Sequence, residues 1–104
     1  MSEHPSAVLA ALADPTRWRV LSTLAERGPG TATTLAGELP VSRPAVIKHL
    51  GVLDRAGLVE SRREGREVRY RARPEPLEAT ARWMAGRAAE WDARLGALKR
   101  LAES

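Results

Sequence analysis

The residues with the clearest chemical potential in this sequence are cations concentrated in its middle part. Between Val41 and Arg73 lie nine Lys and Arg residues and four acids, so this window carries a net charge of +5 while the rest of the chain sums to −1. A guanidinium presents a planar fork of donors that fits phosphate oxygens and the acceptor edge of guanine. The local excess of positive charge therefore predicts an acidic partner, and favours nucleic acid over an ordinary solvated surface.

Residues that could support catalysis or hold a metal are scarce. The sequence has no Cys, which removes disulfides, thiolate metal sites and thiol nucleophiles. Its two histidines, His4 and His49, are too few and too far apart in sequence for an evident metal site. The Gly-Pro-Gly segment at 28–30 lacks the Lys-Ser/Thr pair of a nucleotide-binding loop. We therefore predict no catalytic residue, no metal and no cofactor, and we do not expect an enzyme.

The composition is that of an ordinary globular domain. Hydrophobic residues make up 43% of the 104 residues and charged residues 29%. No stretch approaches the roughly 18 apolar residues that a membrane span needs. The first residues also lack the charged and apolar parts of a signal peptide. We expect one cytoplasmic domain over residues 1–104 with no membrane partner.

A helix is predicted over Ser42–Ala56, inside the window that holds the cations. Ser42 is a typical N-cap, and Pro44 falls in the first turn, where its missing N–H costs nothing. At helical spacing one face collects the apolar residues Val46, Leu50 and Leu53. Lys48 falls on the far side, and His49 falls at the edge of the apolar face. The helix is therefore expected to bury a narrow stripe while it presents cations outward.

Two further helices are predicted near the start of the sequence. The first opens at Pro5, and the second begins after the N-cap Asp14 and ends at Gly28. The expected buried face of the second helix comprises Trp18, Val20, Leu21, Leu24 and Ala25.

A third short helix leads directly into the Ser42–Ala56 helix. Thr31 is its expected cap and Pro40 ends it. Its inward residues are expected to be Leu35, Ala36 and Leu39. Because only Pro40 and Val41 separate the two helices, they must cross steeply, which is the arrangement of a helix-turn-helix.

After Val59 the apolar residues recur at every second position, which predicts strands. Val68, Tyr70 and Ala72 share one face, and arginines occupy the other. Glu64-Gly65 is suited to a tight turn, so we predict a two-stranded β-hairpin. The hairpin carries three arginines near its tip, Arg62, Arg63 and Arg66. Further from the tip, Arg69 and Arg71 are expected to pair with Glu60 or other acids.

The last predicted helix spans 76–103 and opens at Pro76. Its apolar residues recur at spacings of four and three, as in a coiled coil. This seam consists of Leu77, Ala81, Met84, Ala88, Trp91, Leu95, Leu98 and Ala102. The helix either folds back over its own core or packs against a second copy of the chain. We favour a homodimer whose contacts are Val8, Leu12, Leu77, Met84, Ala88, Trp91, Leu95 and Leu98.

The order of these segments resembles the ArsR-type winged helix-turn-helix transcriptional regulators of bacteria. The likeness is carried by "LADPTRWRVLSTLAERG", by "LPVSRPAVIKHLGVLDRAGLVESRREGREVRY" and by the long final helix. It implies a mainly α fold with a small two-stranded wing and a long C-terminal dimerisation helix. It also implies a homodimeric repressor that binds an operator, an imperfect palindrome, in double-stranded DNA. The Cys-x-Cys box and the Asp/His pair of metal-sensing members are absent, so metal sensing is not implied and the effector stays unknown.

On this interpretation the first turn of the Ser42–Ala56 helix approaches base edges in the major groove, and the wing lies along the backbone or in a minor groove. Arg43 is the expected base reader, and Lys48 is expected to hold a phosphate or a base edge. Ile47 either contacts a thymine methyl or packs inward, and His49 either supports the helix or contacts DNA. The predicted DNA-binding residues are Ser42, Arg43, Pro44, Ala45, Ile47, Lys48, His49, Arg62, Arg63 and Arg66. The alternative function is a winged-helix module that binds an acidic protein partner.

Overall fold

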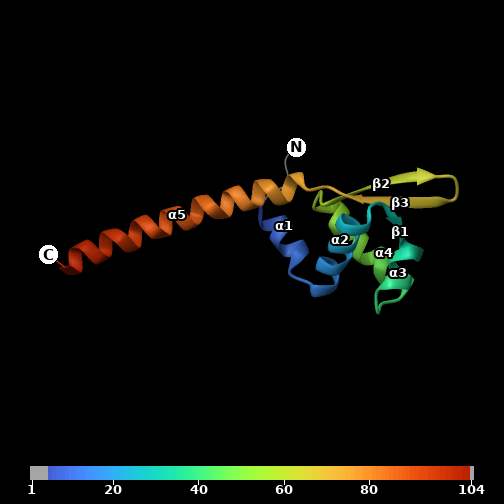
Figure 1. Cartoon of the computed structure of the whole chain (residues 1–104), viewed down its shortest axis with the longest axis horizontal. Coiled ribbons are helices and arrows are strands. Elements are labelled where there is room, and N and C mark those ends of the chain that lie inside the picture. Colours follow the sequence, from blue (N-terminus) through green and yellow to red (C-terminus); the bar gives the residue numbers. More distant parts are fainter. Residues whose placement is uncertain (1–4, 104) are drawn as a thin grey trace.

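The computed structural model describes residues 5–103. Its elements are α1 (Pro5–Leu12), α2 (Pro15–Arg27), β1 (Gly30–Thr31), α3 (Ala32–Glu38), α4 (Arg43–Arg55), β2 (Val59–Glu64), β3 (Glu67–Ala72) and α5 (Glu75–Glu103). Helices α1 to α4 form a body from which the β2–β3 ribbon projects on one side and α5 on the other (Figure 1). The predicted class, mainly helical with a small β wing and a long C-terminal helix, is confirmed.

The sheet has one strand more than the sequence predicted. It is antiparallel with the order β1-β3-β2, and Gly30 and Thr31 pair with Tyr70 and Arg69. The predicted two-stranded hairpin is confirmed as β2 and β3. Strand β1 was missed, because a strand of two residues is too short to show any alternation of apolar and polar residues. The extra strand ties the start of α3 to the wing.

The turn of the hairpin lies one residue later than the sequence predicted. Glu64 pairs with Glu67, which leaves Gly65 and Arg66 as a two-residue loop. Gly65 has a φ of 63°, and in the described chain only glycines have a positive φ. Positive φ at the first loop residue alone is typical of a type II′ turn, which places Gly there. Arg66 therefore sits at the outermost point of the wing.

The core joins all four helices of the body to the base of the wing. Its fully buried side chains are Val8, Val20, Val46, Leu50, Leu53, Leu58 and Val59. The predicted inward face of α4 is thereby confirmed. The predicted face of α2 was too wide, because its contacts with α1, α4 and β3 bury only Val20, Leu21 and Leu24. The Trp18 side chain is 53% exposed, and Ala25 is exposed too.

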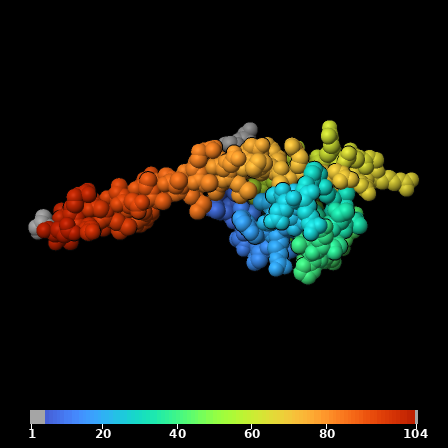
Figure 2. Space-filling view, viewed as in Figure 1, coloured from blue at the N-terminus to red at the C-terminus, as the bar shows by residue number. Residues whose placement is uncertain are grey.

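Helix α5 packs on the body only through its first turns. It begins at Glu75, one residue before the predicted start, and Pro76 and Thr80 are its buried residues. The contacts with α1 lie at this end, and beyond it α5 extends as a rod with no other element against it in Figure 2. The alternative in which this helix folds back over its own core is therefore wrong. No helix in the described part of the chain combines the length and apolar content needed to cross a membrane.

The start of α2 is fixed by its N-cap, as predicted. Asp14 Oδ1 accepts hydrogen bonds from the backbone N–H of Thr16 at 2.7 Å and of Arg17 at 3.1 Å. The Arg17 hydrogen bond is the main cause that lowers the pKa of the Asp14 carboxyl from its ordinary value, and His49 and the Arg17 guanidinium add attraction. A carboxyl with a lowered folded-state pKa stabilises the fold above its unfolded-state pKa, and this contribution is lost as pH falls through the folded-state pKa.

Replacing Asp14 with Ala is expected to lower the free energy of unfolding at neutral pH, because two N–H groups lose their acceptor. The difference from the parent chain should shrink as pH falls below about 4, where unfolded Asp takes up a proton. Urea denaturation across this pH range measures both effects. Asp14→Asn keeps an acceptor without a titratable group, so it should retain the cap and lose the pH dependence. A destabilisation by Asp14→Ala that is constant with pH would contradict the assignment.

Candidate nucleic-acid interface

Helices α3 and α4 form a helix-turn-helix, and a side chain caps the N-terminus of each helix. Thr31 accepts a hydrogen bond from the Thr34 backbone N–H at 3.2 Å, and the Thr34 hydroxyl accepts one from the Thr31 N–H at 3.0 Å. Ser42 Oγ accepts from the backbone N–H of Ala45 at 3.3 Å and so fixes the first turn of α4. These local bonds fix where each helix begins. The orientation of α4 is then set by its packing on α3 and α2.

The two faces of α4 have opposite characters. Val46, Leu50 and Leu53 are fully buried. The exposed residues of its first turns are Ser42, Arg43, Pro44, Ile47 and Lys48, with Ala45 half-buried among them. The first turn carries no acidic residue, and the N-terminus of a helix has a partial positive charge. This surface therefore suits an anionic ligand that also presents hydrogen-bond acceptors to a guanidinium.

Arg43 is tied to the preceding helix. Its Nε donates a hydrogen bond to Thr33 Oγ1 of α3 at 3.1 Å. Sequence reasoning singled out Arg43 but missed Thr33, because ten residues separate them and only the crossing of the two helices brings them together. The two terminal nitrogens of Arg43 form no hydrogen bond or ion pair within the described chain.

The two interpretations of Ile47 differ in where its side chain lies. It is 42% exposed, so inward packing was wrong. It borders a hollow of about 300 Å³ between α4 and the wing, together with Arg43, Arg66, Val68 and Tyr70. Arg43 of α4 and Arg66 of the wing therefore line the same hollow, together with apolar side chains, threonines and the carboxylate-bearing Glu67.

His49 lies at the edge of the buried face of α4, as predicted. Its ring is half-buried, and within the described residues its buried Nδ1 has no hydrogen-bond partner. His49 also contributes to lowering the pKa of the Asp14 carboxyl, the N-cap of α2, and α2 packs on α4. This position fits a supporting residue.

The arginines of the wing fall into two groups. Arg69 Nε lies 2.8 Å from Glu64 Oε2, and Arg71 Nε donates to Glu60 Oε1 at 2.8 Å, which confirms the predicted pairing. The Arg71 bond is also the main cause that lowers the pKa of the Glu60 carboxyl. Within the described chain, no acidic group lies in ion-pair contact with the wing-tip arginines, Arg62, Arg63 and Arg66. Arg69 and Arg71 are thus compensated by acids, whereas Arg62, Arg63 and Arg66 are not, although Arg62 lies opposite Arg69 in the register of the two strands.

Known proteins are similar to this chain in sequence and in fold. A family model described as a helix-turn-helix domain matches residues 12–62. The chain is 45% identical to the HTH-type transcriptional regulator Rv2034 of Mycobacterium tuberculosis, over 72% of this chain and 69% of that protein. It is 31% identical to the transcriptional repressor SdpR of Bacillus subtilis, over 74% of this chain and 84% of that protein. An ArsR-like transcriptional regulator from Rhodococcus sp. RHA1 has a solved structure that is 51% identical, with a TM-score of 0.87 over 96% of this chain and 93% of that one.

The chain belongs to the ArsR family of winged helix-turn-helix transcriptional regulators. Its relatives and its fold are those of DNA-binding regulators and not of enzymes. Within the part of this ArsR-family regulator that the structure describes, no group of three or more His, Cys, Asp or Glu residues could hold a metal ion.

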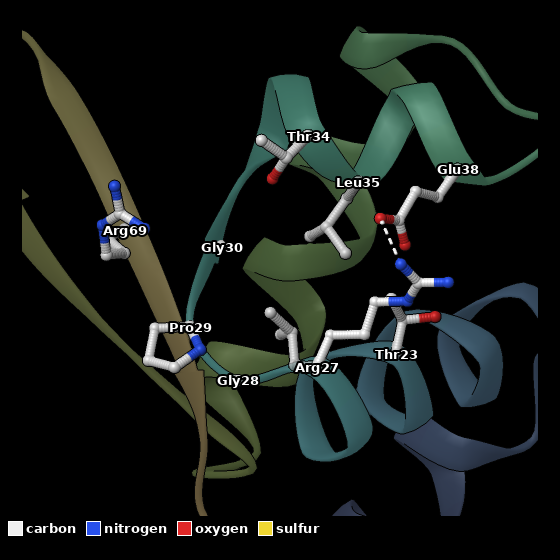
Figure 3. A pocket seen from close by; sticks show the side chains of 10 residues that line it. Thr23, Arg27, Gly28, Pro29, Gly30, Thr34, Leu35, Glu38 and Arg69 are labelled. Atoms are coloured by element: carbon white, nitrogen blue, oxygen red, sulfur yellow. Dashed lines mark hydrogen bonds and ion pairs between the residues drawn. The ribbon is translucent and has the colours of Figure 1, made fainter.

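A second cavity of this regulator lies away from the hollow beside α4. It has a volume of about 170 Å³ and is formed by the end of α2, by α3 and by β3. Arg27 of α2 and Glu38 of α3 close one side through an ion pair of 3.1 Å, and Arg69 of β3 lies opposite in this view (Figure 3). Since both arginines are already paired with glutamates, the cavity offers no uncompensated charge to an anionic ligand.

The predicted dimerisation residues differ in exposure. Met84, Ala88, Trp91, Leu95 and Leu98 are exposed along α5 of this ArsR-family chain. Leu12 and Leu77 are half-buried. Val8 is fully buried in its own core, so its prediction as a contact residue was wrong, and α1 presents Leu9 instead. The exposed apolar residues therefore continue without interruption along the free part of α5.

Proposed function

We propose that this chain is a sequence-specific transcriptional repressor that binds an imperfect palindromic operator as a homodimer. Residues 1–104 then form one DNA-binding domain, and 76–103 form its dimerisation helix. The observation that carries the proposal is the exposed start of α4, which lies beside a wing whose tip arginines are unpaired in the described chain. Its relation to the transcriptional repressor SdpR supports repression.

Helix α4 would enter the major groove with its first turn toward the bases. Arg43 would take guanine through its terminal nitrogens, and Lys48, one turn further on, would hold a phosphate or a base edge. Ile47 would meet a thymine methyl, because its side chain is exposed beside Arg43. Ser42, Pro44 and Ala45 would bring the helix start close to the DNA, with His49 in support.

Two copies joined along α5 would place two α4 helices on the same side of the dimer. Burying the exposed apolar residues of α5 supplies the driving force for association. In a twofold dimer the two helices contact half-sites about one helical turn apart, or a multiple of it. The operator is therefore expected to be an imperfect inverted repeat.

Selection of bound fragments from a random DNA pool tests this proposal with the full chain. The expected result is one enriched inverted repeat whose half-sites are separated by about 10 base pairs or a multiple of that distance. Binding without an enriched motif that disappears at moderate salt would contradict specific repression and would favour an acidic protein partner. Transcription from a promoter that carries the selected site, with and without the protein, then distinguishes repression from activation.

The wing supplies a separate prediction. Arg63→Ala or Arg66→Ala should weaken binding to operator and random DNA by similar factors, because these side chains would contact phosphates or a minor groove. Each lost phosphate contact should reduce the slope of log affinity against log salt by about 0.9. Fluorescence anisotropy over a range of salt concentrations measures both effects. Arg100→Ala removes the same charge from the far end of α5 and should leave the slope unchanged. A loss confined to the operator would contradict the phosphate assignment.

A further inference from the structure

The hydrogen bond between Thr33 and Arg43 joins the two helices of the helix-turn-helix at their exposed end. Arg43 Nε donates to Thr33 Oγ1 at 3.1 Å, and both residues are exposed. Neither side chain is needed to fill the core, whose α3 and α4 members are Ala32, Leu35, Val46, Leu50 and Leu53. Core packing therefore does not explain why the two side chains meet.

The atoms used by the bond leave the contact end of Arg43 available. A guanidinium has five N–H donors in a fixed plane, and only one of them belongs to Nε. With Nε bonded to Thr33, the four remaining donors on the two terminal nitrogens still form the fork that fits guanine O6 and N7. The acceptor is also a neutral hydroxyl, so it orients the guanidinium without cancelling its positive charge.

Thr33 itself stands on a fixed part of the backbone. The mutual bonds of Thr31 and Thr34 define the first turn of α3 around it. The preceding residues, Gly30 and Thr31, pair with β3. An exposed arginine normally loses much rotamer freedom when it binds, and a partner that restrains it beforehand reduces that loss.

We infer that Thr33 is a positioning residue for base recognition by Arg43. It holds the guanidinium at the exposed end of the helix-turn-helix through Nε, which leaves the terminal nitrogens available, and it determines how strictly the dimer distinguishes the base pair that Arg43 contacts. This inference rests on the proposed function, in which Arg43 contacts a base.

Thr33→Val tests the inference, because Val has nearly the same shape without the acceptor. It should lower the ratio of operator to random-DNA affinity by about 3- to 10-fold for each half-site, the range that one net hydrogen bond supports, and so by about 10- to 100-fold for the dimer. The preference at one base pair of each half-site should relax, while affinity for random DNA stays unchanged. Thr33→Ser keeps the hydroxyl and should restore the ratio. Thr23→Val makes the same substitution on α2 and should have no effect.

The Arg43→Ala background separates positioning from a direct contact. There Thr33→Val should cause no further loss, because the side chain it positions is absent. An equal loss on operator and random DNA, a full loss in the Arg43→Ala background, or no rescue by serine would each overturn the inference. If the parent chain selects no motif, the proposed function itself fails. If the parent selects one and Thr33→Val keeps the full ratio, only this inference fails.

Discussion

Replacing Leu95 with Glu is expected to leave the chain monomeric and to reduce operator binding by at least about 100-fold. Leu95 is 57% exposed at the middle of the free part of α5, within the seam of apolar residues. In the proposed dimer this position is buried, and a carboxylate there would lose its hydration without a partner. A monomer contacts one half-site only, so the second contact no longer benefits from a high effective concentration. Sedimentation equilibrium and gel shift with the selected operator measure the two effects.

The matched control for this variant is Ala93→Glu. Ala93 is exposed on the same helix but lies on the side opposite the seam, so the added charge should stay in water and the dimer should persist. Circular dichroism should show both variants folded, because neither residue belongs to the core. A monomeric parent chain at micromolar concentration, or a dimeric Leu95→Glu protein with undiminished operator affinity, would contradict the proposed assembly.

The parts of the fold that could be predicted are those with local causes. Asp14, Thr31 and Ser42 each cap a helix through bonds to residues no more than three positions away. The pairs of Arg69 and Arg71 with acids follow from the alternation of the wing strands. The hairpin turn lies one residue later than predicted, because Gly65, with its positive φ, occupies the first of the two loop positions.

The parts that could not be predicted depend on how elements meet. Strand β1 exists only because Gly30 and Thr31, which follow α2, lie beside β3. The exposure of Trp18 depends on which elements cover α2, whereas the spacing of apolar residues gives only the width of its apolar face. The bond from Thr33 to Arg43 likewise requires the crossing of α3 and α4. Within the candidate site, sequence therefore identified the residues that face outward on α4 but not the residue that restrains one of them.

Arg43→Ala should have the largest effect on base recognition. One bidentate contact to guanine contributes about 1–3 kcal/mol of discrimination, and the proposed dimer would make this contact in both half-sites. We therefore expect operator affinity to fall by roughly 30- to 20,000-fold if the two half-sites contribute about 1–3 kcal/mol each, while random-DNA affinity falls only through the lost charge. Anisotropy titrations with the operator, with single-base variants of it and with random DNA give the discrimination at each position.

Arg55→Ala is the matched control, because it removes the same charge from the other end of the same helix. Arg55 is exposed in the last turn of α4, and in the described chain no acid pairs with it. Its loss should lower operator and random-DNA affinity alike, and only slightly, since that end of α4 points away from the bases in the proposed complex. Only Arg43→Ala should flatten the preference at one base pair of each half-site. If Arg43→Ala and Arg55→Ala instead weaken all DNA equally, Arg43 contacts phosphate, and the base preference of this regulator must come from Ile47, Lys48 or the shape of the DNA.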